Sequence, residues 1–262
     1  MSDEIRTERE GGLLLIELNR PEALNAWTPE LGQLLLKAVI EGSEDADVRA
    51  ILITGAGRAF SSGADLRAAR KLTPEGEPDL SSNLREIYNP IMLAVRSAPK
   101  PVIAAVNGPA AGIGAALALA CDLIVAAESA YLLLAFVNIG LIPDGGAAYM
   151  LATRVGYGRA AQLAMLGERL PAARGLEWGV FNAVFPDDGF RDSAREYAAR
   201  LAAGPTVALG NMKRVLSSGA HAALGGQLAL EAELQQANAT THDYPEGVAA
   251  FREKRRPEFL GQ

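Results

Sequence analysis

Short apolar runs rich in β-forming residues alternate with helical patterns through the first half of the chain, and this alternation limits the possible folds most. Residues 28–45 read as a helix that Thr28 caps and Pro29 opens. Strands that are separated by helices usually pair in parallel, so the sequence predicts an α/β fold with much parallel pairing. The strand-like runs are residues 13–19, 49–57, 100–108, 122–128 and 131–135.

The pattern changes near Asp187, after which the sequence predicts successive helices and no strand. Pro186, Pro205 and Pro245 separate these helices. We therefore expect a core at residues 1–190 that holds the active site, and a C-terminal helical region at residues 191–262.

Composition excludes several classes of protein. With 262 residues, 49% of them apolar, the chain can bury a large core. Its net charge is −6 and it has no stripe of Lys and Arg, which argues against nucleic acid as a partner. The apolar run at 110–121 is too short to span a bilayer, and the charged start has no apolar signal core. Cys121 is the only cysteine, so we expect a cytoplasmic protein without a disulfide and without membrane contact.

Two glycine turns follow buried strand-like runs, at residues 57–66 and 107–117. In each turn a strand ends, glycines allow an unusual backbone path, and a helix begins. Such turns can aim backbone N–H groups at one point, where a helix N-terminus adds positive potential. Two such donors would make an oxyanion hole, although tight packing of strand on helix uses the same glycines.

Other glycine-loop and nucleophile chemistries fit poorly. The dinucleotide fingerprint fails because Leu117 stands at its sixth position, and no glycine loop ends in Gly-Lys-Ser/Thr. Ser61 and Ser62 are not in a nucleophile elbow, and the only histidines, His221 and His242, are in the C-terminal part. No group of His, Asp and Glu has the spacing of metal ligands, so we expect no metal.

One acid stands out in the stretch IGLIPDGGAAY, where Asp144 lies between an apolar run and a glycine pair. An Asp in a desolvated pocket has a raised pKa and can carry a proton to and from a substrate. Capping of the helix that follows is the commoner role for such a residue. The residues alone leave both readings open.

Six motifs then occur in a recognisable order along nearly the whole chain. In that order they resemble the crotonase superfamily, the enoyl-CoA hydratase/isomerase group. The resemblance implies a core of spiral β/β/α turns, a C-terminal helical trimerisation region, and acyl-CoA thioester substrates. The motifs are NRPEALNAW, GRAFSSGADL, KPVIAAVNGPAAGIGAALALACDLIVAAESA, IGLIPDGGA, EWGVFNAVFP and EGVAAFREKRRPEF.

The resemblance also implies site residues. The oxyanion donors are the backbone N–H groups of Ala64 and Ile113. Phe136 and Leu141 are expected to wall and dry the site. Residues that would contact coenzyme A, which enters only as part of the substrate, are Arg20, Ala23, Ser62, Asp65, Leu66, Phe251 and Lys254. For Lys254 an ordinary solvated surface position is an equally good reading.

The acids decide the reaction. The resemblance puts the two glutamates of hydratases at positions 116 and 136, where this chain has Ala116 and Phe136. Addition of water normally needs two carboxylates, so hydratase chemistry is disfavoured. Asp144 matches the position where isomerases of the family carry their base. The sequence therefore predicts a Δ3-Δ2-enoyl-CoA isomerase with one carboxylate and no second acid opposite it.

Two alternatives remain. One is a hydratase or another crotonase-type reaction that uses Asp144 with a bound water, and the other is an idle acyl-CoA-binding homologue. For assembly we expect a homotrimer or hexamer, because Leu224, Leu228 and Leu234 form an apolar stripe that a lone core is not expected to cover fully.

Overall fold

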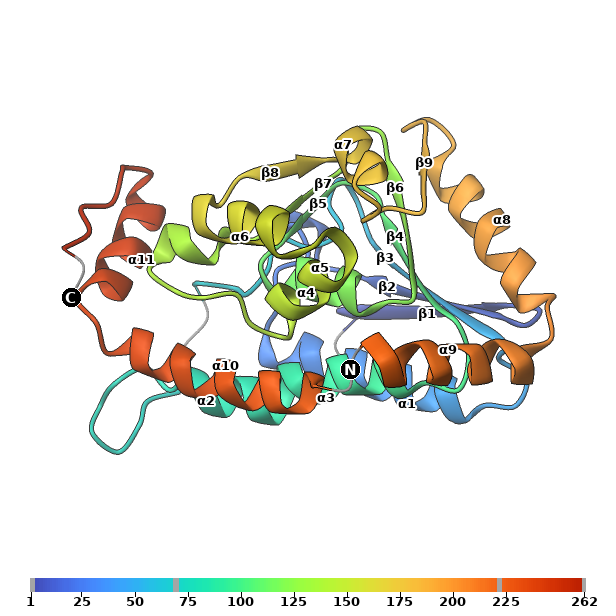
Figure 1. Ribbon diagram of the computed structural model, residues 1–262, viewed down its shortest axis with the longest axis horizontal. Coiled ribbons are helices and arrows are strands. Elements are labelled where there is room, and N and C mark those ends of the chain that lie inside the picture. The colour runs from blue at the N-terminus through green and yellow to red at the C-terminus, as the bar shows by residue number, and fades with distance from the viewer. Residues whose placement is uncertain (1–2, 68–70, 221–222, 261–262) are drawn as a thin grey trace.

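The computed structural model describes residues 3–67, 71–220 and 223–260. His221 lies outside these ranges. Two sheets and a series of helices make up the fold (Figure 1). The strands of the larger sheet are, in order across it, β1 (Ile5–Glu10), β2 (Leu13–Leu18), β3 (Ala50–Gly55), β4 (Val102–Val106), β6 (Leu123–Ala127) and β9 (Ala183–Phe185). Those of the smaller sheet are β5 (Pro109–Ala111), β7 (Tyr131–Leu133) and β8 (Arg169–Pro171).

The helices account for most of the remaining chain. Two short 3-10 helices, Pro21–Ala23 and Ala135–Ile139, and one π-helical turn, Leu84–Tyr88, complete the set. The helices are α1 (Pro29–Glu44), α2 (Leu80–Asn83), α3 (Asn89–Ser97), α4 (Ile113–Ala120), α5 (Ala147–Val155), α6 (Tyr157–Leu166), α7 (Ala172–Glu177), α8 (Phe190–Ala202), α9 (Thr206–Ala220), α10 (Leu224–Ala239) and α11 (Asp243–Glu253).

Successive turns of the chain supply one strand to each sheet. β4 adds to the larger sheet and β5 to the smaller, α4 follows, and then β6 and β7 repeat the step with parallel pairing. Only the β1–β2 and β7–β8 pairs are antiparallel among the described strands. The expected α/β fold of spiral β/β/α turns, followed by a helical region, is confirmed.

Local sequence signals explain where the helix α1 begins and why the strand β3 is buried. Thr28 caps α1 as predicted, because its Oγ1 accepts a hydrogen bond from the Leu31 N–H at 3.0 Å. Every residue of β3 is buried, as expected for a strand covered on both faces. α8 crosses the larger sheet, and α1 and α3 lie on its other side (Figure 1).

Three expectations were incomplete or wrong. The charged segment of β1 is an exposed edge strand, which the apolar patterning did not show. The sequence patterning indicated no helix between residues 71 and 97, whereas the structure is helical there from Leu80 to Ser97. Leu224 and Leu228 do not belong to an uncovered stripe, because both are buried against the rest of the chain, whereas Leu234 is exposed.

The C-terminal helices dock on the core through polar as well as apolar contacts. Lys213 of α9 is buried, lies 2.8 Å from the Asp122 carboxylate, and donates to the Val95 carbonyl in α3. α10 runs beside α2 and the π-helical turn (Figure 1). Its buried face is turned toward the segment that carries Asp144, and this contact shapes the candidate site.

Candidate active site

The two glycine turns lie against each other like paired strands. Ser61 pairs with Ala110, because the Ser61 N–H donates to the Pro109 carbonyl at 3.0 Å and the Ala111 N–H donates to the Ser61 carbonyl at 2.8 Å. This pairing brings together segments that are about fifty residues apart in the sequence.

Close approach of the turns requires glycine. Gly63 and Gly112 both have positive φ, +96° and +53°. A Cβ atom on Gly63 would lie 3.0 Å from the Ala111 carbonyl oxygen and 3.6 Å from the Cα of Gly112. The residues that follow these glycines, Ala64 and Ile113, are therefore neighbours.

Both of these residues keep a free backbone donor. Trp27 pairs with the residues on either side of Ala64, through Trp27 N–H to Gly63 O at 2.8 Å and Asp65 N–H to Trp27 O at 3.0 Å, which leaves the Ala64 N–H facing away from that pairing. Ile113 is the first residue of α4, where an N–H has no partner within the helix. Within the described ranges neither N–H donates a hydrogen bond. The structure thus places the two predicted oxyanion donors side by side.

Asp144 is a buried acid and not a helix cap. Gly146 occupies the N-cap position of α5, and no side chain caps that helix. The Asp144 side chain is 5% exposed, and its Oδ2 accepts a hydrogen bond from Nε2 of Gln235 at 3.0 Å. Its Oδ1 is buried and has no hydrogen-bond partner in the described structure. The capping interpretation of this Asp is wrong.

The Asp144 segment packs on the start of α4. A Cβ on Gly145 would lie 2.7 Å from Cδ1 of Ile113 and 3.1 Å from Cβ of Ala116. The ring of Phe136 reaches the Gly112 turn, at 4.0 Å from a Cβ placed there. Asp144, Ile113 and Phe136 are therefore parts of one site, in which the two positions of the hydratase glutamates hold a methyl group and a phenyl ring.

Burial controls the proton affinity of this site. Desolvation raises the pKa of Asp144 to about 7, and the hydrogen bond from Gln235 works in the opposite direction. Burial also raises the pKa of Tyr88, and the Asp144 charge adds to that rise. Tyr88 ends the π-helical turn and packs edge-on against Trp27, with ring centres 5.5 Å apart.

A second carboxyl group lies beside the Asp144 turn, contrary to the prediction of a lone acid. Glu231 of α10 is 2% exposed, and burial, with a contribution from the Asp144 charge, raises its pKa to about 7. Both of its oxygens are engaged, since Oε2 accepts from the Gly146 N–H at 2.7 Å and Oε1 accepts from Nε2 of Gln227 at 3.3 Å. Glu231 and Gln235 are the main site residues that sequence reasoning missed.

The residues expected to contact coenzyme A gather around the first glycine turn. The Arg20 guanidinium bonds Asp65 Oδ2 at 3.2 Å and Glu4 Oε1 at 3.1 Å, so its charge is already compensated within the chain. The hydroxyl of Ser62 donates to the carbonyl of Ala23 at 3.3 Å. These contacts order the turn, while the contacts to coenzyme A remain a prediction.

The end of α11 reaches the same turn. Phe251 is 63% exposed, and Lys254 is an exposed residue just beyond the helix. Between them, Arg252 donates to the carbonyl of Leu66. The sequence analysis did not single out Arg252, although it is the residue that joins α11 to the turn within one chain.

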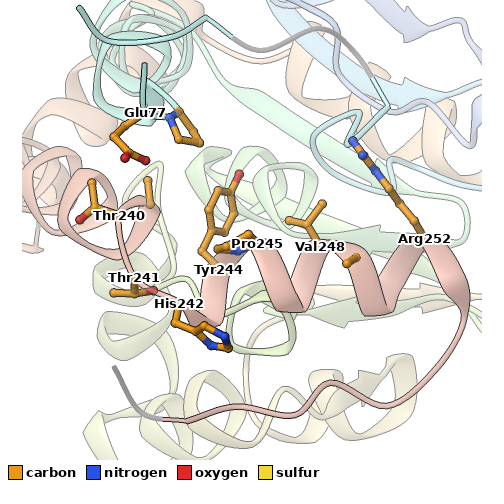
Figure 2. Close-up of a pocket in the computed structure, with 11 residues that line it drawn as sticks. Glu77, Thr240, Thr241, His242, Tyr244, Pro245, Val248 and Arg252 are labelled. Atoms are coloured by element: carbon orange, nitrogen blue, oxygen red, sulfur yellow. The ribbon is translucent and has the colours of Figure 1, made fainter. Parts of the chain in front are cut away.

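A cavity of about 600 Å³ lies between α11, the end of α10 and the Glu77–Pro78 segment (Figure 2). Tyr244, Val248 and Arg252 project into or along it from α11. Asp144 is not on its wall, but Tyr244 is, and Tyr244 packs in one apolar cluster with Leu141. The half-buried Leu141 thus links this cavity to the Asp144 segment.

An α/β spiral that presents two free N–H groups next to a buried carboxyl group is suited to acyl-thioester chemistry. The family model for enoyl-CoA hydratase/isomerase matches residues 8–262. The chain therefore belongs to the enoyl-CoA hydratase/isomerase family of the crotonase superfamily, whose members act on acyl-CoA thioesters.

Relatives divide between two activities. The chain is 41% identical to 1,2-epoxyphenylacetyl-CoA isomerase of Escherichia coli K12, over 100% of both chains. It is 43% identical to a Rhodobacter capsulatus protein named "Probable enoyl-CoA hydratase", over 98% of both. A crystal structure of an enoyl-CoA hydratase from Mycobacterium avium subsp. paratuberculosis superposes with a TM-score of 0.89, at 37% identity over 98% of both chains.

None of the helices among the described residues combines the length and the hydrophobicity that a membrane-spanning segment needs. The same residues contain no group of three or more His, Cys, Asp or Glu side chains placed to hold a metal ion.

Asp144→Asn should stabilise the fold at alkaline pH. Because the native pKa of Asp144 is raised to about 7 from the ordinary value of 3.8, the native state binds more protons than the unfolded state between those values, and the free energy of unfolding falls as pH rises through that window. Asparagine removes this loss, so the variant should gain about 4 kcal/mol relative to wild type at about pH 8 and much less near pH 4. Urea unfolding at both pH values measures it, and an equal difference at both would contradict the buried ionisation.

Proposed function

We propose that this protein is a Δ3-Δ2-enoyl-CoA isomerase that uses Asp144 as its proton-transfer group. The observation that carries the proposal is the buried carboxyl group of Asp144, which has one unpaired oxygen. Its segment packs against the turn of Ile113, whose free backbone N–H lies near the free N–H of Ala64. Moving a double bond from C3 to C2 needs these parts and no redox or metal cofactor. Coenzyme A enters only as part of the substrate.

In the proposed reaction, Oδ1 of Asp144 removes a proton from C2. Negative charge then develops on the thioester oxygen, where the Ala64 and Ile113 N–H groups stabilise it by about 3–4 kcal/mol per donor. The same carboxyl group returns the proton at C4. A pKa of about 7 suits this cycle, because the group must both accept and release a proton at neutral pH.

Glu231 bears on the choice between isomerase and hydratase. A hydratase would use two acids, and Glu231 is the one other buried carboxyl group found next to Asp144 in the described structure. The two oxygens of Glu231 accept hydrogen bonds from Gly146 and Gln227, whereas Oδ1 of Asp144 accepts none in the described structure. This difference favours a structural role for Glu231 and a single catalytic acid. Water addition to crotonyl-CoA by wild type, lost in Glu231→Gln, would instead support the hydratase.

The E. coli relative supplies a second substrate to assay. Its name says that it isomerises an epoxide of phenylacetyl-CoA. Phe136 and Tyr88 bring aromatic rings to the surroundings of Asp144, which suits an aromatic acyl group. The substrate panel should therefore contain 1,2-epoxyphenylacetyl-CoA beside 3-enoyl-CoA. We also propose that the reaction takes place in the cytoplasm and belongs to lipid or related acyl-CoA metabolism.

Asp144→Asn should lower the isomerisation rate by about 10²–10⁴-fold, the usual contribution of a general base. With 3-enoyl-CoA as substrate, the conjugated enoyl thioester that forms is followed by its absorbance. Because the base works as the carboxylate, wild-type kcat/KM should rise with pH and level off above about 7.

Equal rates for wild type and Asp144→Asn would remove this residue from the mechanism. If calorimetry shows binding of acyl-CoA thioesters while no member of the panel turns over, the protein is an idle binding homologue and not an enzyme.

Gly114→Ala should damage the oxyanion hole. A Cβ at this position would lie 2.9 Å from the Ser61 carbonyl oxygen and 2.6 Å from its Cβ, so α4 and the Ser61 turn must move apart. Displacing one donor should cost about 10–10²-fold in kcat, with a smaller change in KM. The control is Gly158→Ala in α6, where a Cβ meets nothing within 4 Å, and a similar kcat loss there would contradict the argument.

We also propose assembly into a homotrimer or hexamer. Large apolar side chains stay exposed on α9 and α10, which favours burial against other copies. Light scattering at micromolar concentration should therefore report a trimer or its double, and a monomer would contradict the proposal. The exposed side chains are Val207, Met212, Val215 and Leu216 of α9, and Leu230 and Leu234 of α10.

A further inference from the structure

One face of α10 is tied to the Asp144 turn at three points. The Ile142 N–H donates to Oε1 of Gln235 at 3.1 Å, Nε2 of Gln235 donates to Oδ2 of Asp144 at 3.0 Å, and the Gly146 N–H donates to Glu231 at 2.7 Å. Glu231 and Gln235 are four residues apart, so they lie one turn apart on the same helix face. α10 thus holds the backbone on both sides of the acid as well as the acid itself.

The contacts of Gln235 fix which way its amide points. Its oxygen is the only part of the amide that can accept from the Ile142 N–H, so its NH₂ group must face Asp144. Gln235 itself is 1% exposed, and a buried amide has no water with which to exchange these partners. It can therefore only donate to Asp144.

A donor held against one carboxylate oxygen has two consequences. It occupies Oδ2, so Oδ1 is the oxygen left for a proton from the substrate. It also favours the ionised form of the acid and so opposes the effect of burial. The titratable groups whose charges interact with Asp144 are Glu231 of α10 and Tyr88 of the π-helical turn, and Tyr244 of α11 acts on Tyr88. The described residues form no salt bridge to Asp144 that could replace the donor.

We propose that Gln235 is a positioning residue that selects Oδ1 of Asp144 as the proton-transfer oxygen and stabilises the carboxylate form of this acid through its hydrogen bond to Oδ2. The choice of oxygen rests on the proposed isomerase. The effect of the Gln235 hydrogen bond on the ionisation of Asp144 does not rest on that function, because it can be measured without turnover.

The test replaces the donor by a side chain of similar length, in Gln235→Met. Titration of ¹³C-labelled aspartate carboxyl groups by NMR, with the Asp144 resonance identified from its loss in Asp144→Asn, gives the pKa directly. We expect the midpoint to rise by about half a pH unit or more. In the isomerase assay we expect kcat to fall about tenfold or more, the rising limb of kcat/KM to shift to higher pH by the same amount, and KM to change less than kcat.

Gln236→Met is the matched control, because Gln236 has the same chemistry on the same helix but bonds the 78–81 segment and not Asp144. It should leave the Asp144 midpoint unchanged. Gln235→Glu is a second variant that keeps an acceptor for the Ile142 N–H and places an acid against Asp144, so it should also raise the midpoint.

An unchanged midpoint in folded Gln235→Met or Gln235→Glu, or an equal shift in Gln236→Met, would overturn the proposal. If the Asp144 titration midpoint shifts in Gln235→Met while the wild type turns over neither substrate, the effect of Gln235 on Asp144 is supported. The same result would overturn the proposed isomerase.

Discussion

The site depends on the contact between two backbone turns. Gly63 and Gly112 let the turns meet without intervening side chains, and this contact brings Ala64 and Ile113 together. Each donor is free for a separate reason: the strand-like pairing of Trp27 spares one, and a helix start spares the other. Neither side chain takes part, so the proposed stabilisation of an anion depends on the path of the backbone alone.

The buried acid whose segment packs on the start of α4 reflects a conflict between stability and the proposed activity. Burial makes ionisation of Asp144 and Glu231 costly, and the chain keeps both groups in a core region. The amide of Gln235 and the N–H of Gly146 reduce that cost without removing it. An acid fully neutralised by a cation would be more stable in its ionised form but a weaker base, so the absence of a salt bridge to Asp144 among the described residues suits proton transfer.

The sequence indicated the elements whose signals are local. Thr28 before Pro29 predicted the start of α1, and glycines after apolar strands predicted the turns that carry Ala64 and Ile113. Asp144 was recognised by its apolar surroundings and by resemblance to the family. Glu231 and Gln235 could not be recognised, because α10 carries polar residues on several sides and its spacing does not show which ones face inward. That depends on how α10 docks, which is a long-range property, and the same ambiguity explains the wrong assignment of Leu224 and Leu228 to an uncovered stripe.

The hydrogen bonds between α10 and the Asp144 turn join residues that are some ninety positions apart in the sequence. During synthesis on the ribosome, the two glycine turns and the acid emerge well before Leu224, so the early chain contains every group of the proposed reaction but lacks the helix that bonds the acid. Substitutions at Gln235 or Glu231 would accordingly change the working pH of the proposed reaction without altering Asp144, Ala64 or Ile113.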